Sequence, residues 1–353
     1  MAQTQERRAS NWTSDAAARA DSTSFLSRLY GAALAHRRIL RRLGAAASIC
    51  IIAVSALIFL RTLIFVDPSK FKAAIASTNG EQLALSFAFT GLSYLALTGY
   101  DGLALRHLRI KVPYSLTALA SFVSYAVSFT LGFPLVTGGA VRFWIYGPAG
   151  LSAGKVASLT VVAGVTFWLG LGFIAGVGFM SASDAVAEID RFHPLANRLI
   201  GICVIGALIV YLGWVGRMRR RRAAVFGNFI LPGPILTLGQ MALGVIDVCS
   251  AAAALYVLLP RGSGIGFPTF ATLYSFAAML GIASHSPGGL GVFEATILQG
   301  VGGSADAVLA SLLLFRFVYY VTPFIAALAL LGAVEAWRRW RSLREAMSDP
   351  SDD

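Results

Sequence analysis

The chain alternates long apolar segments with short polar stretches over most of its length. A helix needs about 20 predominantly apolar residues to cross the hydrocarbon core of a bilayer. Five windows meet or approach this requirement: Leu43–Val66, Leu83–Leu105, Val156–Met180, Leu199–Val215 and Ala305–Ala333. A soluble domain rarely buries that many apolar helices. The pattern predicts an all-α polytopic membrane protein.

Two further apolar regions are interrupted by residues that break helices. Val112–Tyr146 ends in "GFPLVTGGAVRFWIY", where Gly138 and Gly139 are candidate breaks. Gly266–Gly303 contains "HSPGGLGVFE". Its candidate breaks are Pro287, Gly288, Gly289 and Gly291. Non-helical backbone at membrane depth is tolerated only inside protein or along a wet cavity, so both breaks are expected to shape a site.

The arginine clusters indicate which segment ends face the cytoplasm. His36–Arg42, Arg217–Arg222 and Arg338–Arg344 each flank an apolar segment, as cytoplasmic positive charge does. Both termini are therefore expected in the cytoplasm. The count of spans then requires Val112–Tyr146 to start and end inside, and Gly266–Gly303 to start and end outside.

This count predicts about six full spans plus two broken re-entrant helical hairpins that enter from opposite sides. Pairs of short full spans satisfy the same count, and an inverted repeat is a topological option only. Corresponding interrupted segments in two halves of a chain are typical of a transporter site.

The composition supports a membrane protein and narrows its partners. Of the 353 residues 57% are hydrophobic and only 13% are charged, with a mean hydropathy of +0.71. Soluble domains carry roughly 25% charged residues. The net charge of +12 lies beside apolar segments, which favours anionic lipid over nucleic acid as its partner. The three cysteines lie in apolar segments without metal-ligand or disulfide spacing, so no metal or cofactor is expected.

Three regions follow from these patterns. Residues 1–41 form a basic cytoplasmic tail that is expected to be disordered, and residues 42–337 form the membrane domain. Residues 338–353 form a cytoplasmic tail with both basic and acidic side chains. No cleavable signal peptide is expected, because the apolar run that starts at Leu43 is too long and too late in the chain.

Ionisable side chains inside apolar segments are the candidate functional residues, since intramembrane charges usually face a protein interior or water. The candidate substrate-binding residues are Asp101, Arg142, Asp247, His285, Glu294 and Arg316.

Several of these residues have two interpretations. Arg142 either anchors a loop at the cytoplasmic face or clamps a phosphate with its planar guanidinium. Glu294 either caps a helix that restarts after the break or binds a cation. His285 is more typical of a hydrogen-bonded filler than of a proton relay. Four tyrosines are expected to be interfacial or packing aromatics: Tyr100, Tyr146, Tyr319 and Tyr320.

Enzyme motifs are absent from the sequence. It contains no GxxxxGK[ST] phosphate loop and no HExxH metalloprotease motif. Ser284 and Ser286 flank His285, but neighbours in sequence rarely form a serine–histidine pair by themselves. The chain is therefore expected not to be an enzyme, and any transport is expected not to be driven by ATP hydrolysis in this chain.

Three stretches together resemble a known family. They are "LTGYDGLAL" around Asp101, "SYAVSFTLGFPLVTGGAVRFWIYGPAGLS" around Arg142, and "HSPGGLGVFEATIL" around Glu294. They resemble the flippase-like membrane domain of bacterial lysylphosphatidylglycerol synthase/flippase proteins, a family that includes stand-alone members without a synthetase. The likeness runs in order over roughly Arg42–Arg339.

The resemblance implies a domain that moves aminoacylated or related phospholipids between leaflets, with Asp101, Arg142 and Glu294 as its polar landmarks. Only a short tail follows Arg339, so the soluble aminoacyltransferase domain is not expected here.

The resemblance and the charges together predict a flippase or scramblase for anionic or aminoacylated phospholipid in a bacterial inner membrane. Arg142, with Arg316, would hold the phosphate, and Asp101 and Glu294 would attract a cationic headgroup. The alternatives are a secondary transporter of a soluble ion or metabolite and a non-transporting partner of a lipid-modifying enzyme. Membrane lipid is the expected partner, and a homo-oligomer and a separate lipid-modifying enzyme are further options.

Overall fold

The computed structural model describes residues 74–76, 78–132, 134–190, 192–220, 225–226, 229–230, 232–260, 262–284 and 287–348. All of them belong to one compact unit. The expected tail at 1–41, the apolar window Leu43–Val66 and the candidate His285 lie outside the described residues.

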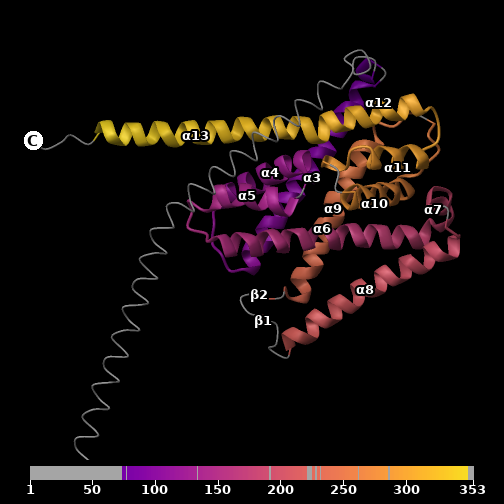
Figure 1. Ribbon diagram of the computed structural model, residues 1–353, viewed down its shortest axis with the longest axis horizontal. Helices are drawn as coiled ribbons and strands as arrows, with labels where there is room; N and C mark the ends of the chain where they lie inside the picture. The colour runs from indigo at the N-terminus through magenta and orange to yellow at the C-terminus, as the bar shows by residue number, and fades with distance from the viewer. Residues whose placement is uncertain are drawn as a thin grey trace, which may run out of the picture. The chain divides into compact units, whose positions relative to one another are not determined.

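The described part of the chain is built almost entirely from helices (Figure 1). The first half contains α3 (Gly80–His107), α4 (Tyr114–Leu131), α5 (Pro134–Tyr146), α6 (Ala153–Ser181), α7 (Ser183–Asp190) and α8 (Pro194–Arg220). A small antiparallel pair follows, β1 (Val225–Phe226) and β2 (Phe229–Ile230). The second half contains α9 (Pro234–Tyr256), α10 (Phe267–Ala283), η1 (Pro287–Gly289), α11 (Val292–Gly300), α12 (Ala305–Arg316), η2 (Phe317–Val321) and α13 (Thr322–Ser348).

Local sequence signals set several helix starts. Asn79 caps α3: its side chain accepts from the Glu81 backbone N–H, and the Gln82 side chain accepts from the Asn79 backbone N–H. Pro234 opens α9 at a position where its missing N–H costs nothing, and Pro268 lies in the first turn of α10. Polar and proline residues in the loops therefore decide where the apolar helices begin.

Six helical segments within the described ranges are long and apolar enough to cross a membrane. They are Gly80–His107, Tyr114–Leu131, Ala153–Ser181, Pro194–Met218, Pro234–Tyr256 and Ala305–Val334. The predicted class, an all-α polytopic membrane protein, is confirmed. By length and composition α4 also qualifies as a span, which fits the pair of short full spans that the sequence left open beside a re-entrant hairpin.

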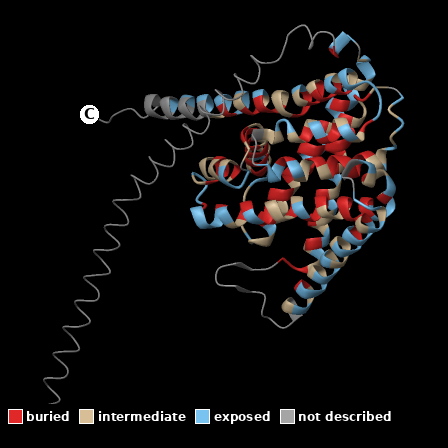
Figure 2. Ribbon diagram, turned by 45° about the vertical axis from the view of Figure 1, so that its right-hand side comes forward, coloured by how far each residue is buried: buried red, intermediate tan, exposed pale blue. Residues whose placement is uncertain are grey.

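The exposure of α8 shows why this bundle needs an apolar surrounding. Its membrane-length window is only 11% buried, and its exposed side chains include Leu199, Ile209 and Val210. Figure 2 shows mostly exposed and intermediate residues along α8, while buried residues gather where the other helices meet. A continuous exposed apolar helix of this length fits contact with lipid tails.

Two interrupted hairpins pack against opposite ends of α6. Gly139 of α5 faces Thr160 in the first third of α6, whereas Gly178 in its last turn lies directly against Thr272 of α10. Figure 1 shows α4 and α5 beside the N-terminal part of α6 and α10 and α11 beside its C-terminal part. In each half of the chain, a long helix is followed by a broken hairpin and then by another long helical segment.

The break of the first hairpin lies at Gly132, not at the Gly138–Gly139 pair that the sequence suggested. Gly132 follows α4 with φ 79°, a left-handed angle that glycine adopts without strain. Gly138 and Gly139 lie inside α5. The prediction was wrong because an α-helix tolerates glycine, and here the missing side chain of Gly138 makes room for Ser128 Oγ, 2.8 Å from its ideal Cβ position.

The second break matches the residues named from the sequence. After α10 ends at Ala283, the chain turns through η1, where Gly288 and Gly289 have φ 60° and 68°. Gly291 has φ 86° and precedes α11. Three left-handed glycines in four residues explain why this stretch is so rich in glycine.

Candidate functional site

The first ion pair joins two helices that are far apart in sequence. Asp101 on α3 and Arg142 on α5 are separated by 41 residues, yet Arg142 Nε lies 2.9 Å from Asp101 Oδ2 and its Nη2 lies 2.7 Å from Oδ1. The side chains are 0% and 2% exposed. This two-pronged geometry is the strong form of an arginine–carboxylate pair.

Aromatic side chains complete the surroundings of this pair. Tyr146 donates its hydroxyl hydrogen to Asp101 Oδ2 at 3.2 Å. The ring of Tyr125 lies 4.7 Å from the Arg142 guanidinium carbon, and its edge meets Tyr100. A cation held by a carboxylate and an aromatic face is well stabilised away from water. In this conformation Arg142 therefore has no surface to offer to a phosphate.

The second ion pair lies at the break of the other hairpin. Arg316, the last residue of α12, pairs with the Glu294 carboxylate through Nε and Nη2. Its Nη1 donates to the Gly288 carbonyl oxygen at 3.2 Å, and its guanidinium carbon lies 5.3 Å from the Tyr320 ring centre. Glu294 also accepts from the Gly291 backbone N–H at 2.7 Å. Glu294 thus caps α11, as one interpretation predicted, and forms an ion pair with Arg316, whereas its role in binding a substrate cation stays a prediction.

The two ion pairs differ in how far their side chains are exposed. Arg316 and Glu294 are 19% and 18% exposed, whereas Asp101 and Arg142 are buried. The sequence suggested one cluster of phosphate-binding arginines and amine-binding acids. The structure instead gives each arginine its own acid.

Asp247 on α9 forms a third site, which contains no arginine. Its side chain is 2% exposed and accepts from Ser93 Oγ at 2.5 Å and from the Tyr100 hydroxyl at 2.8 Å. Ser93 Oγ also lies 2.8 Å from the Tyr319 hydroxyl. Sequence analysis named Asp247, Tyr100 and Tyr319 separately, but it did not name Ser93 and did not predict these contacts.

Of the two options that the sequence left for the four tyrosines, interfacial or packing, the structure supports packing. Tyr100 and Tyr146 are 0% exposed, and each donates a hydrogen bond to a buried carboxylate. Tyr319 and Tyr320 lie in η2, a π-helical stretch between α12 and α13. Such stretches are rare and frequently mark functional sites. The available signal was the run "FVYYV", which follows Arg316 directly.

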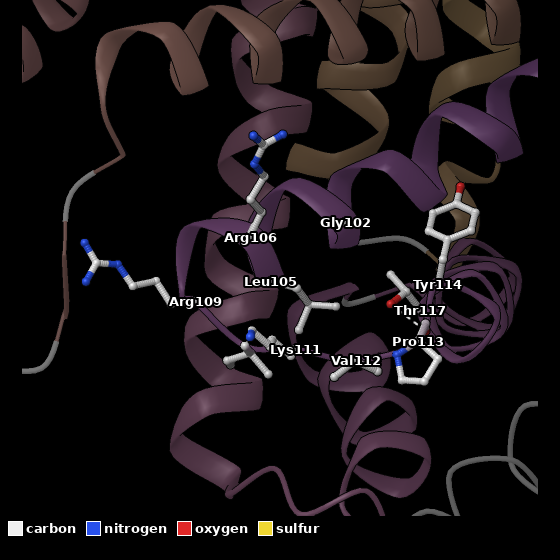
Figure 3. A pocket seen from close by; sticks show the side chains of 10 residues that line it. Gly102, Leu105, Arg106, Arg109, Lys111, Val112, Pro113, Tyr114 and Thr117 are labelled. Carbon is white, nitrogen blue, oxygen red and sulfur yellow. Dashed lines mark hydrogen bonds between the residues drawn. The ribbon is translucent and has the colours of Figure 1, made fainter.

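A basic cavity of about 600 Å³ opens at the C-terminal end of α3 (Figure 3). Arg106, Arg109 and Lys111 line one side, and Tyr114 and Thr117 line the other. Its ten lining residues include no acid. Gly102, which follows Asp101 directly, is also part of the wall. The cavity wall therefore includes three basic residues and no acid, and it reaches α3 one residue after Asp101.

Metal ligation has no support in the part of the chain that the structure describes. No group of three or more His, Cys, Asp and Glu side chains gathers there in a metal-binding arrangement.

The fold and the sites define a multi-pass membrane protein with two interrupted hairpins and arginine–carboxylate pairs in its interior. The chain belongs to the family described as "Lysylphosphatidylglycerol synthase TM region", whose model matches residues 48–327. Family membership connects the chain with membrane lipid metabolism or transport.

Named relatives fall into two groups. The chain is 30% identical over 284 residues to "Uncharacterized protein slr0712" of Synechocystis, covering 77% of this chain and 85% of that protein. It is 26% identical over 289 residues to "Inner membrane protein YbhN" of Escherichia coli, covering 80% and 89%. It is also 29% identical over 252 residues to the "Phosphatidylglycerol lysyltransferase" of Staphylococcus epidermidis, covering 70% of this chain but only 29% of that much longer protein.

Proposed function

We propose that this chain moves phospholipids with anionic or aminoacylated headgroups between the two leaflets of a bacterial inner membrane. Both termini face the cytoplasm in this proposal, as the arginine clusters favour. The chain acts as a flippase or scramblase and not as an enzyme, and movement is either downhill or coupled to a gradient.

The Arg316–Glu294 pair carries the proposal. It joins a cation and an anion at a break in a membrane-embedded hairpin, and both side chains are partly exposed. A headgroup with a phosphate and an amine can replace each partner, because Arg316 can take the phosphate and Glu294 the ammonium group. This exchange keeps both protein charges and both headgroup charges paired while the lipid crosses the apolar region.

The relatives support a lipid as the substrate. The match to a phosphatidylglycerol lysyltransferase covers 70% of this chain, and that enzyme's name identifies phosphatidylglycerol as its acceptor. The 252 matched residues would then be a part of both proteins that handles the lipid.

The basic cavity fits the cytoplasmic end of such a path. Its three cations and absence of acids favour a phosphate, and the tetrahedral phosphate of any phospholipid meets that requirement. Gly102 in the cavity wall follows Asp101 along α3, so the cavity and the buried Asp101–Arg142 pair share that helix.

Reconstituted liposomes test the proposal. Headgroup-labelled phosphatidylglycerol or lysyl-phosphatidylglycerol is placed in both leaflets, and a membrane-impermeant reagent reports how fast the inner label becomes accessible. The proposal predicts faster exchange than in empty liposomes, and loss of the gain in Glu294→Gln and Arg316→Gln but not in Asp306→Asn, an exposed acid on the same helix as Arg316.

A parallel flux measurement separates the rival transporter. If radiolabelled glycerophosphoglycerol, the headgroup without tails, crosses quickly while labelled lipid does not, the substrate is a soluble solute and the proposal fails.

A further inference from the structure

Asp247 is a buried carboxylate whose hydrogen-bond donors carry no charge. It is 2% exposed, and its donors in the described structure are the hydroxyls of Ser93 and Tyr100. Both donors lie on α3, and Asp247 lies near the middle of α9. The carboxylate is therefore held far from either end of the helices that carry it.

The titratable groups around Asp247 on the neighbouring elements are tyrosines. Tyr100 of α3 donates to Asp247, and Tyr319 of η2 reaches it through Ser93 Oγ. The rings of Tyr94 of α3 and Tyr125 of α4 pack against Tyr319 and Tyr100, and Tyr274 of α10 is the further titratable side chain of this surrounding. Arg142 and Arg316 are each paired with a different acid, and among the described residues no cation forms an ion pair with Asp247.

An unbalanced carboxylate in an apolar interior is costly, and protonation removes that cost without any other partner. A proton on one carboxyl oxygen also reverses a hydrogen bond, because the acid must then donate to Ser93 or Tyr100. Ser93, released as a donor, can donate to Tyr319 instead of accepting from it. A proton on Oδ1, the oxygen that faces Ser93, thus changes the hydrogen bonding of η2.

The π-helical segment connects this change to the exposed ion pair. Tyr319 and Tyr320 are adjacent in η2, and their ring centres lie 5.4 Å apart. The Tyr320 ring lies against Arg316, which precedes η2 directly. A shift of Tyr319 is therefore transmitted through one short, irregular segment to the Arg316–Glu294 pair.

We propose that Asp247 is a proton-binding site, and that its protonation controls the Arg316–Glu294 pair through Ser93 and Tyr319. One proton from water on one side converts the carboxylate to the carboxylic acid, and the same proton leaves to the other side when the site reopens. No bond other than O–H forms or breaks. The coupling to headgroup movement rests on the proposed function, whereas proton binding at Asp247 does not.

Infrared spectroscopy tests proton binding directly. Difference spectra of the purified protein between acidic and alkaline buffer report the C=O stretch of each carboxyl group that titrates. We expect a band from a buried carboxyl in the wild type and in Asp306→Asn, and its loss in Asp247→Asn at unchanged helix content. If Asp247→Asn retains every titrating band, or if sodium rather than protons alters the spectrum, Asp247 is not a proton site.

Transport in the same liposomes tests the coupling. We expect an imposed pH gradient to change the lipid exchange rate of the wild type by about 5-fold or more, a typical coupling. In Asp247→Asn and Tyr319→Phe the rate of lipid exchange should be the same with and without the pH gradient. Tyr319→Phe should still show the infrared band of the buried carboxyl. If the wild type moves lipid without regard to the gradient, the coupling is wrong. If it moves no lipid at all, the proposed function fails, while the infrared titration still decides the proton site.

Discussion

Gly288 of the second hairpin lies directly against Phe129 of the first. A Cβ atom on Gly288 would lie 3.3 Å from the Phe129 carbonyl oxygen. Because Phe129 is in the last turn of α4, the turn of one hairpin rests on the tip of the other. The two hairpins, which the charge pattern predicts to enter from opposite sides of the membrane, therefore meet at their tips inside the bundle.

This contact predicts that alanine substitutions at two glycines of the same turn lower the stability by different amounts. Gly288→Ala and Gly291→Ala both force a side chain into the left-handed region, at a cost of roughly 1–2 kcal/mol each. Only Gly288 also faces a neighbour, since nothing lies within 4 Å of a Cβ on Gly291. We expect both variants to lower the thermal stability in detergent, and Gly288→Ala to lower it further. Equal losses would show that the contact between the tips contributes nothing.

The Asp101–Arg142 pair predicts a strong asymmetry between single and double variants. Asp101→Asn leaves a buried guanidinium without its anion, which typically costs about 3–5 kcal/mol. Replacing both residues with methionine removes the charge altogether and should recover most of that loss. Denaturant or thermal unfolding of the two variants and the wild type measures the difference. A double variant no more stable than Asp101→Asn would mean that the ion pair contributes more to stability than charge balance.

Two glycines of α6 provide a test of helix packing. A Cβ on Gly170 would lie 2.1 Å from the Gly244 carbonyl carbon of α9, whereas a Cβ on Gly172 meets nothing within 4 Å. Gly170→Ala should force α6 and α9 apart and cost about 1–3 kcal/mol or more. Gly172→Ala should be neutral or stabilising by up to about 1 kcal/mol, because alanine is the better helix former. Similar unfolding temperatures for the two variants would contradict the close crossing.

The basic cavity predicts a salt-sensitive preference for anionic lipid. Each basic residue near an anionic surface contributes about 1 kcal/mol, so Arg106→Gln with Lys111→Gln should weaken binding of phosphatidylglycerol by roughly 10-fold or more. Lipid titration in neutral nanodiscs measures the affinity. Arg198→Gln, at the start of α8, is the matched control and should change nothing. An unchanged affinity in the double variant would rule out the cavity as a headgroup site.

The sequence predicted the class of fold because the signals for it are local. Apolar windows, prolines at helix starts and three glycines in "HSPGGLGVFE" each act within a few residues. The position of the first break was missed for the same reason, since Gly132 and the Gly138–Gly139 pair look alike until helix geometry separates them.

The sequence could not predict which acid pairs with which arginine. Asp101 and Arg142 are 41 residues apart, and Glu294 and Arg316 are 22 apart, so only the crossing of helices decides which acid meets which arginine. The sequence allowed the tyrosines to be packing aromatics, but it did not reveal which polar groups they meet. The carboxylate contacts of Tyr100 and Tyr146 depend on how α3 crosses α9 and α5, which no local sequence signal gives.

The most direct test of the account is the initial rate of leaflet exchange for headgroup-labelled lysyl-phosphatidylglycerol in liposomes. The rates to compare are those of the wild type, Glu294→Gln, Arg316→Gln and the control Asp306→Asn at equal protein density. The account predicts exchange above empty liposomes for the wild type and the control, and exchange at the empty-liposome rate for both ion-pair variants. Wild-type exchange no faster than in empty liposomes, or unchanged exchange in Glu294→Gln and Arg316→Gln, would contradict a headgroup path through this pair.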